Sequence, residues 1–232
     1  MMSPARFLIT GGSQGIGAAV VELARKAGHQ VVFTGRNVPL IDALADRTGA
    51  HGVQADVSVG ADNARTVDVC LERMGGVDVL VNNAAYGYRA EIGALDVARM
   101  KAMFDTNVFG LVDLTNRVVA QMKARGAGDI VNIASTSGMK GAAAATPYAA
   151  SKWAVRGISQ CWQAELRPHG IRVLCLCPSE VQTEFGGRSG RNNPNKLYGQ
   201  DIAATILAAL DMPRRVLWPE LAVFATNPWK ED

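Results

Sequence analysis

Apolar positions along the chain follow two alternating patterns. Short runs of consecutive Val, Ile and Leu predict strands that are apolar on both faces, as in the interior of a parallel sheet. Longer stretches with apolar residues three or four positions apart predict amphipathic helices. The predicted strands are Ala5–Thr10, Gln30–Thr34, Gly52–Ala55, Val77–Asn82, Asp129–Ala134 and Arg172–Cys177. The predicted helices are Gly15–Ala27, Val38–Thr48, Ala61–Met74, Val97–Arg125, Tyr148–Arg167 and Gln200–Leu210.

This alternation of strand and helix predicts an α/β fold, a doubly wound parallel sheet with helices on both faces. A last strand is expected within Arg214–Trp229, which would make about seven strands in all. No linker, repeat or low-complexity segment divides the chain, so residues 1–232 are expected to form one domain. Gly186–Asn195 is rich in Gly, Asn and Ser, and it predicts either a solvated loop or a lid over a site.

Composition excludes several classes of protein. The chain is 48% hydrophobic and 19% charged with a net charge of +3, which is typical of a globular protein and does not predict nucleic-acid binding. No secretory leader or apolar run long enough for a membrane span is recognisable, so a cytoplasmic protein with no membrane contact is expected. The cysteines lack CxxC spacing and a histidine cluster, and we expect reduced thiols and no metal site: Cys70, Cys161, Cys175 and Cys177.

Glycines cluster where the first strand meets the first helix, in the stretch LITGGSQGIG. A helix N-terminus at the carboxyl edge of a parallel sheet offers free N–H groups to a pyrophosphate, and glycines allow the backbone to approach it. The spacing is Gly11-x-x-x-Gly15-x-Gly17, which differs from the common GxGxxG pattern, and the GK[ST] ending of a nucleoside-triphosphate loop is missing. The stretch therefore predicts nucleotide binding without triphosphate hydrolysis.

The end of the second strand bears on the choice of nucleotide. A carboxylate at this place would bind the ribose 2′-hydroxyl of NAD, but the sequence has Gly35 and Arg36. A guanidinium suits a 2′-phosphate, and the Ser13 hydroxyl is a further donor. These residues favour NADP over NAD, although Arg36 is also compatible with an ordinary solvated surface position.

A tyrosine and a lysine four residues apart suggest acid–base chemistry. Tyr148 and Lys152 follow Pro147 at the expected start of a helix, so both side chains share one face. A lysine cation beside a phenol lowers the phenol pKa, and such a tyrosine can exchange a proton with a carbonyl oxygen. Ser135 ends the preceding strand, where its hydroxyl could bond the same oxygen.

At these residues the sequence resembles the short-chain dehydrogenase/reductase family over nearly its whole length. Ala85 and Ser179 stand where the family motifs have glycine, and neither change removes a catalytic atom. The matching segments are the TGxxxGxG loop Thr10–Gly17, the pair Asp56 and Val57 beside adenine, the NNAG-like Asn82–Ala85, the helix asparagine Asn107, the catalytic Ser135, Tyr148 and Lys152, and the nicotinamide segment Pro178–Thr183.

The resemblance implies a Rossmann-like fold and hydride transfer between a nicotinamide and a carbonyl or alcohol carbon. It implies that Tyr148 is the acid–base group, that Lys152 holds the nicotinamide ribose and lowers the Tyr148 pKa, that Ser135 positions the carbonyl, and that Asn107 supports a water relay. The predicted cofactor contacts are Gly11, Ser13, Gln14, Gly15, Ile16, Gly17, Arg36, Asp56, Val57, Asn83, Ala84, Ala85, Tyr148, Lys152, Pro178, Val181 and Thr183.

The function implied is that of an NADP(H)-dependent reductase of ketones or aldehydes, with 3-oxoacyl thioesters among the candidate substrates. A homodimer or homotetramer and a flexible substrate loop over residues 184–199 are also implied; Arg188 and Arg191 in that loop could meet an anionic substrate or water alone. Two alternatives stay open: an NAD-dependent alcohol dehydrogenase, and a non-catalytic NADP-binding sensor or scaffold. An extended-family epimerase fits poorly, because only a short segment follows Thr183.

Overall fold

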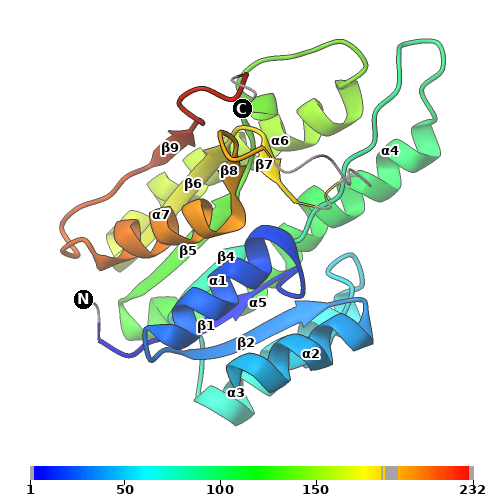
Figure 1. Ribbon diagram of the computed structural model, residues 1–232. Coiled ribbons are helices and arrows are strands. Elements are labelled where there is room, and N and C mark those ends of the chain that lie inside the picture. Colours follow the sequence, from blue (N-terminus) through cyan, green and yellow to red (C-terminus); the bar gives the residue numbers. More distant parts are fainter. Residues whose placement is uncertain (1–2, 184, 186–192, 230–232) are drawn as a thin grey trace.

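Seven parallel strands form one twisted sheet in the order β3-β2-β1-β4-β5-β6-β9 (Figure 1). The computed structural model describes residues 3–183, 185 and 193–229. The chain crosses over between β3 and β4, so β1 lies in the middle of the sheet beside both β2 and β4. This arrangement confirms the predicted doubly wound α/β fold. The strands are β1 Arg6–Ile9, β2 Gln30–Gly35, β3 His51–Gln54, β4 Val79–Asn82, β5 Gly128–Ile133, β6 Ile171–Pro178 and β9 Glu220–Val223.

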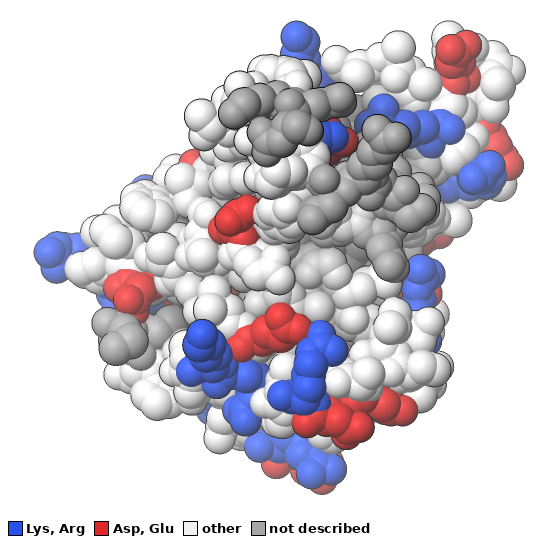
Figure 2. All heavy atoms as spheres, in the orientation of Figure 1, with Lys and Arg blue, Asp and Glu red and all other residues white. Residues whose placement is uncertain are grey.

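Helices cover both faces of the sheet. Helices α1, α2 and α7 pack on one face, and α3, α5 and α6 pack on the other. On the face drawn in Figure 2, basic and acidic side chains are interspersed over the lower part of the molecule. The helices are α1 Gly15–Lys26, α2 Val38–Thr48, α3 Gly60–Met74, α4 Val97–Phe104, α5 Leu111–Arg125, α6 Thr146–Leu166 and α7 Gly199–Asp211.

The pleat of β1 explains why its apolar residues are consecutive. Phe7 and Ile9 point into the core beneath α1 and α2, whereas Leu8 points into the core beneath α3 and α5. All three side chains are completely buried. Alternate residues of a strand face opposite sides, so a strand covered on both faces needs an apolar residue at every position.

The predicted helix Val97–Arg125 is interrupted in its middle. A π-helical segment, Asp105–Gly110, separates α4 from α5, and the three helical segments follow one another without a loop. Gly110 lies against the carbonyl oxygen of Val57, where any side chain would collide. The segment includes Asn107, and such wide turns often occur at functional sites. The apolar spacing on either side of the segment is helical, so the sequence pattern did not reveal the interruption.

A small second sheet was not predicted. Its strands, β7 Val181–Gln182 and β8 Leu197–Tyr198, pair in parallel and join the two ends of the predicted loop 184–199. Gln182 reinforces the junction, because its side chain accepts from the backbone N–H of Asn193 and donates to its carbonyl oxygen, both at 2.6 Å. The interior of that loop, with Arg188 and Arg191, lies outside the described residues. In the described part of the chain, no helix is long and apolar enough to cross a membrane.

Candidate active site

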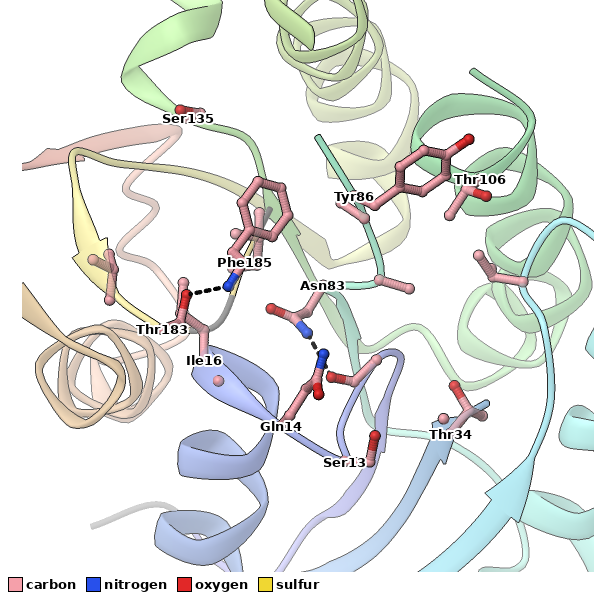
Figure 3. Close-up of a pocket in the computed structure, with 18 of the residues that line it drawn as sticks. Ser13, Gln14, Ile16, Thr34, Asn83, Tyr86, Thr106, Ser135, Thr183 and Phe185 are labelled. Carbon is pink, nitrogen blue, oxygen red and sulfur yellow. Dashed lines mark hydrogen bonds between the residues drawn. The ribbon is translucent and has the colours of Figure 1, made fainter. Parts of the chain in front are cut away.

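A cavity of about 420 Å³ opens at the carboxyl edge of the sheet (Figure 3). Loops after β1, β2, β3, β4, β5 and β6 all contribute to its wall. Ligands of doubly wound folds bind at this edge, where the order of the strands reverses. The predicted residues that line it are Gly11, Ser13, Gln14, Gly15, Ile16, Arg36, Asp56, Val57, Asn83, Ala84, Ala85, Ser135, Tyr148, Lys152, Pro178, Val181 and Thr183.

The glycine loop forms the floor of this cavity at the start of α1. Gly11 and Gly15 have φ of +60° and +58°, a conformation that favours glycine, and a Cβ on Gly11 would lie 2.9 Å from the Ala84 Cα atom. The side chain of Gln14 at the helix N-cap makes no capping bond, and the first turn holds no acidic residue. The N–H groups of this helix end are therefore available to an anion, and they fit a pyrophosphate.

Gly17 does not line the cavity and lies behind the glycine loop. It is buried against the Gly11 carbonyl oxygen, and a Cβ there would lie 2.6 Å from Asn83 Nδ2. Asn83 Nδ2 donates to the carbonyl oxygens of Thr10 and Gly11 at 2.9 and 3.0 Å, so the segment after β4 holds the loop in place. Ala85 is compatible with its position, because its backbone does not have positive φ.

The end of β2 leaves no room for a side chain at residue 35. A Cβ on Gly35 would lie 2.6 Å from the hydroxyl oxygen of Ser13, so Ser13 fills the place of a side chain there. Arg36 Nη1 lies 3.6 Å from Asp56 Oδ2, and 68% of the Arg36 side chain is exposed. Burial raises the pKa of Asp56, but hydrogen bonds from Ser58 and the Arg36 charge outweigh burial and keep that pKa below its ordinary value. Ser13 and Arg36 are thus the donors that face this corner of the cavity.

Three predicted catalytic residues meet at the opposite end of the cavity. Ser135 follows β5, and Tyr148 and Lys152 lie one turn apart in α6. The backbone N–H of Ser137 donates to Ser135 Oγ at 3.1 Å, which leaves the hydroxyl proton of Ser135 to be donated elsewhere. Helix α6 begins at Thr146, two residues earlier than predicted, with Pro147 in its first turn.

The pKa of Tyr148 is raised in this structure, whereas the sequence led us to expect a lowered value beside Lys152. Burial is the largest influence and raises the Tyr148 pKa above its ordinary value, while a hydrogen bond with Ser135 and the Arg89 charge lower it to a lesser extent. Lys152 Nζ lies 5.7 Å from the centroid of the Tyr148 ring and donates instead to the Ile133 carbonyl oxygen at 2.8 Å. Burial lowers the pKa of Lys152 itself to about 8.

Asn107 lies behind the cavity wall and holds two active-site segments together. Its side chain accepts from the backbone N–H of Tyr86 and donates to the Tyr86 carbonyl oxygen, both at 3.0 Å. It also donates to Ser151 Oγ at 3.1 Å, and Ser151 donates to the Tyr148 carbonyl oxygen at 2.8 Å. These bonds connect Asn107 to Tyr86 and, through Ser151, to Tyr148, whereas its part in a water relay stays a prediction.

Several residues in the cavity wall were not singled out in the sequence. Thr34, Thr106 and Phe185 are among them, from β2, the π-helical segment and the segment after β7. Figure 3 shows their side chains among those of the predicted residues. Phe185 lies only two positions after Thr183, a predicted contact, which is the one feature that could have indicated it.

Comparisons with known proteins agree with this geometry. A family model described as short chain dehydrogenase matches residues 5–194. An uncharacterized oxidoreductase of Staphylococcus saprophyticus is 33% identical over 222 residues, which cover 93% of this chain and 95% of that protein.

Two solved structures similar to this chain are complexes with NADP-type molecules. A closed form of serine dehydrogenase complexed with NADP⁺ has a TM-score of 0.89 and 29% identity, covering 94% of each chain. An alcohol dehydrogenase of the archaeon Thermococcus sibiricus, complexed with 5-hydroxy-NADP, has a TM-score of 0.88 and 26% identity, covering 99% of this chain and 100% of the other.

Proposed function

The chain belongs to the short-chain dehydrogenase family and is an oxidoreductase, and from this premise we propose that it is an NADP(H)-dependent carbonyl reductase. The reaction would convert a ketone or aldehyde to an alcohol, or the reverse, and 3-oxoacyl thioesters are among the candidate substrates. The observation that carries the proposal is that one cavity has the uncapped N-terminus of α1 at one end and Ser135, Tyr148 and Lys152 at the other.

The proposed chemistry divides between the cofactor and the chain. When bound, the nicotinamide supplies or accepts the hydride. Tyr148 donates its proton to the carbonyl oxygen during reduction and takes it back during oxidation. The phenol is protonated at neutral pH, the state in which reduction begins, and its raised pKa makes the phenolate that forms a strong base for the reverse reaction. Ser135 donates a hydrogen bond to the same oxygen and stabilises the negative charge that develops there.

Lys152 has two tasks in this proposal. Its pKa of about 8 leaves the ammonium charged at pH 7, so it stabilises the phenolate that forms when Tyr148 gives up its proton. The same ammonium would donate to the hydroxyls of the nicotinamide ribose. The bond to Ile133 already holds Nζ in the cavity wall, so little side-chain freedom remains to be lost on cofactor binding.

The preference for NADP rests on the end of β2. Ser13 blocks the position of a carboxylate at residue 35, and the exposed Arg36 can turn from Asp56 to a 2′-phosphate. The two NADP-type complexes among the similar structures support the same cofactor. The described residues share one main sheet, which supports one catalytic domain. By the resemblance to the family, we also infer a cytoplasmic homodimer or homotetramer.

The proposal is tested by a turnover screen with NADPH and NADH against ketones, aldehydes, acetoacetyl thioesters and sugars. We expect at least one carbonyl class to oxidise NADPH and the Tyr148→Phe variant to lose turnover, because it lacks the phenolic proton, while its Kd for NADPH stays unchanged. Tight NADPH binding without turnover on any substrate would indicate a sensor or scaffold. A preference for NADH would indicate the NAD-dependent alternative.

A further inference from the structure

The ring of Phe185 packs against the catalytic tyrosine. The centroids of the Phe185 and Tyr148 rings are 5.7 Å apart, and the ring planes make an angle of 55°. Phe185 lines the same cavity as Ser135 and Tyr148, and Figure 3 draws its ring among the side chains of the cavity wall. A single exposed phenylalanine is common on protein surfaces, but contact with the catalytic phenol gives this one a place in the substrate's path.

Local bonds set the position of this ring. The backbone N–H of Phe185 donates to Thr183 Oγ1 at 3.3 Å, and a Cβ on Gly15 at the start of α1 would lie 3.4 Å from the Thr183 side chain. Phe185 is thereby linked to the predicted nicotinamide segment and, through it, to the glycine loop. About 39% of Phe185 remains exposed, so one part of the ring packs on protein while another part faces open space.

Gly87 lies close to both rings. A Cβ on Gly87 would lie 3.1 Å from Phe185 Cε1 and 4.0 Å from Tyr148 Cδ2, so the bare backbone faces both rings. The segment is fixed a few residues later, where the backbone N–H of Ala90 donates to the Ala144 carbonyl oxygen at 2.9 Å. Gly87 has no positive φ, so the need for glycine at this position comes from space and not from backbone conformation.

We propose that Phe185, Gly87 and Tyr148 form an aromatic slot that selects carbonyl substrates carrying a flat apolar group on the carbonyl carbon. The carbonyl oxygen must reach Tyr148 and Ser135, so its substituent lies beside the Phe185 ring. An aryl or conjugated group stacks on such a ring at little cost, whereas a saturated ring is thicker and lacks the favourable aromatic contact. The slot rests on the proposed reductase function and names the substrate class of the same site.

The test compares two ketones of similar size. Acetophenone carries a flat ring and cyclohexyl methyl ketone carries a saturated one, so the ratio of their kcat/KM values with NADPH reports on the slot. We expect the wild type to favour acetophenone and Phe185→Ala to reduce that preference roughly tenfold, the size of a good aromatic pair. Phe185→Tyr keeps the ring and should keep the preference, whereas Phe185→Leu should lose it.

Matched variants separate the slot from a general loss of structure. Gly87→Ala should lower kcat/KM for acetophenone, because the new methyl group meets the Phe185 ring, while the Kd for NADPH stays unchanged. Phe224→Ala deletes an exposed aromatic residue that does not line the cavity and should leave the ratio as in the wild type. A wild type without preference, or a preference that survives Phe185→Ala, would overturn the slot.

A binding measurement keeps the two proposals distinguishable. The Tyr148→Phe enzyme is loaded with NADP⁺ and titrated calorimetrically with each ketone. The titration measures the Kd of each ketone in the absence of turnover. If no carbonyl compound is reduced but acetophenone binds more tightly than the saturated ketone in a Phe185-dependent way, the reductase proposal fails and the slot stands. If ketones are reduced but the two bind equally, the slot fails and the reductase proposal stands.

Discussion

Lys152 Nζ donates a 2.8 Å hydrogen bond to the backbone carbonyl oxygen of Ile133, the last residue of β5. The bond places a cation next to Tyr148, but in a buried setting that lowers the lysine pKa from 10.5 to about 8. The ammonium is therefore held by the sheet itself at a cost in stability. This relationship leads to the first prediction.

The stability of the wild type should depend on pH in a way that Lys152→Met does not. Between pH 8 and 10.5 the unfolded chain keeps a proton on this lysine that the folded chain has lost, so the free energy of unfolding rises with pH across that window. Relative to Lys152→Met, the gain should reach about 3 kcal/mol, because a proton held only by the unfolded chain contributes about 1.36 kcal/mol for each pH unit crossed. Urea unfolding of both proteins at a series of pH values measures it, and parallel curves would contradict the assignment.

Arg36→Ala should weaken NADPH binding much more than NADH binding. The variant loses a charge-assisted contact with the 2′-phosphate, which corresponds to about 1.5–3 kcal/mol or roughly a tenfold to hundredfold increase in Kd. Fluorescence titration with each cofactor measures both constants. Arg117→Ala on α5 is a matched control, because this arginine pairs with Asp113 and does not line the cavity. An unchanged ratio of the two constants would remove Arg36 from the site.

Asn107→Leu should lower both stability and turnover. The leucine removes the partner of the Tyr86 N–H and the donor to Ser151, and each group left unpaired in the interior costs about 1–3 kcal/mol. Ser151→Ala loses the bond to the Tyr148 carbonyl oxygen and the bond from Asn107, but both bonds between Asn107 and Tyr86 remain, so its effect on stability should be smaller. If Asn107 acts by positioning, kcat falls in both variants while the Kd for NADPH changes little. Full activity in both would show that neither bond matters to Tyr148.

Ala144→Gly should stabilise the fold. Ala144 has φ of +56°, and a non-glycine residue in the left-handed region costs about 1–2 kcal/mol. Glycine removes that strain but loses about 0.4–1 kcal/mol through its greater freedom in the unfolded chain, so a net gain between about 0 and 1.6 kcal/mol is expected. Ala143→Gly, at a neighbouring residue without positive φ, should show only the loss. Denaturant midpoints of the wild type, Ala144→Gly and Ala143→Gly measure these differences in stability.

Much of the fold was predictable because local chemistry determined it. The consecutive apolar residues of β1 indicated a covered parallel strand, and the Gly11–Gly17 spacing indicated a glycine loop at the start of α1. The interruption at Asp105–Gly110 was not predictable, because it depends on contact between Gly110 and the distant Val57. The pairing of β7 with β8 was equally hidden, since a two-residue strand has no periodicity to read.

The candidate site was also predictable only in part. The residues with distinctive chemistry, Tyr148 and Lys152, were identified from their spacing, but the pKa of Tyr148 was expected in the wrong direction. The spacing indicates that a cation lies near the phenol. The direction of the pKa shift also depends on how deeply the phenol is buried, which the spacing does not reveal. Phe185 was missed because nothing in the sequence distinguishes this phenylalanine from other apolar residues. Only the structure shows its ring beside Tyr148.

The short pairing of β7 with β8 has a consequence for how the protein could change. The pairing holds Val181–Gln182 beside Leu197–Tyr198. The chain between these strands therefore begins and ends at fixed points near the cavity. Closing a loop twice as long between fixed ends costs only about 0.6 kcal/mol more. Insertions between residues 186 and 192 should therefore leave Tyr148 and the glycine loop in place, whereas changes at Thr183 or Phe185 would alter the cavity wall itself.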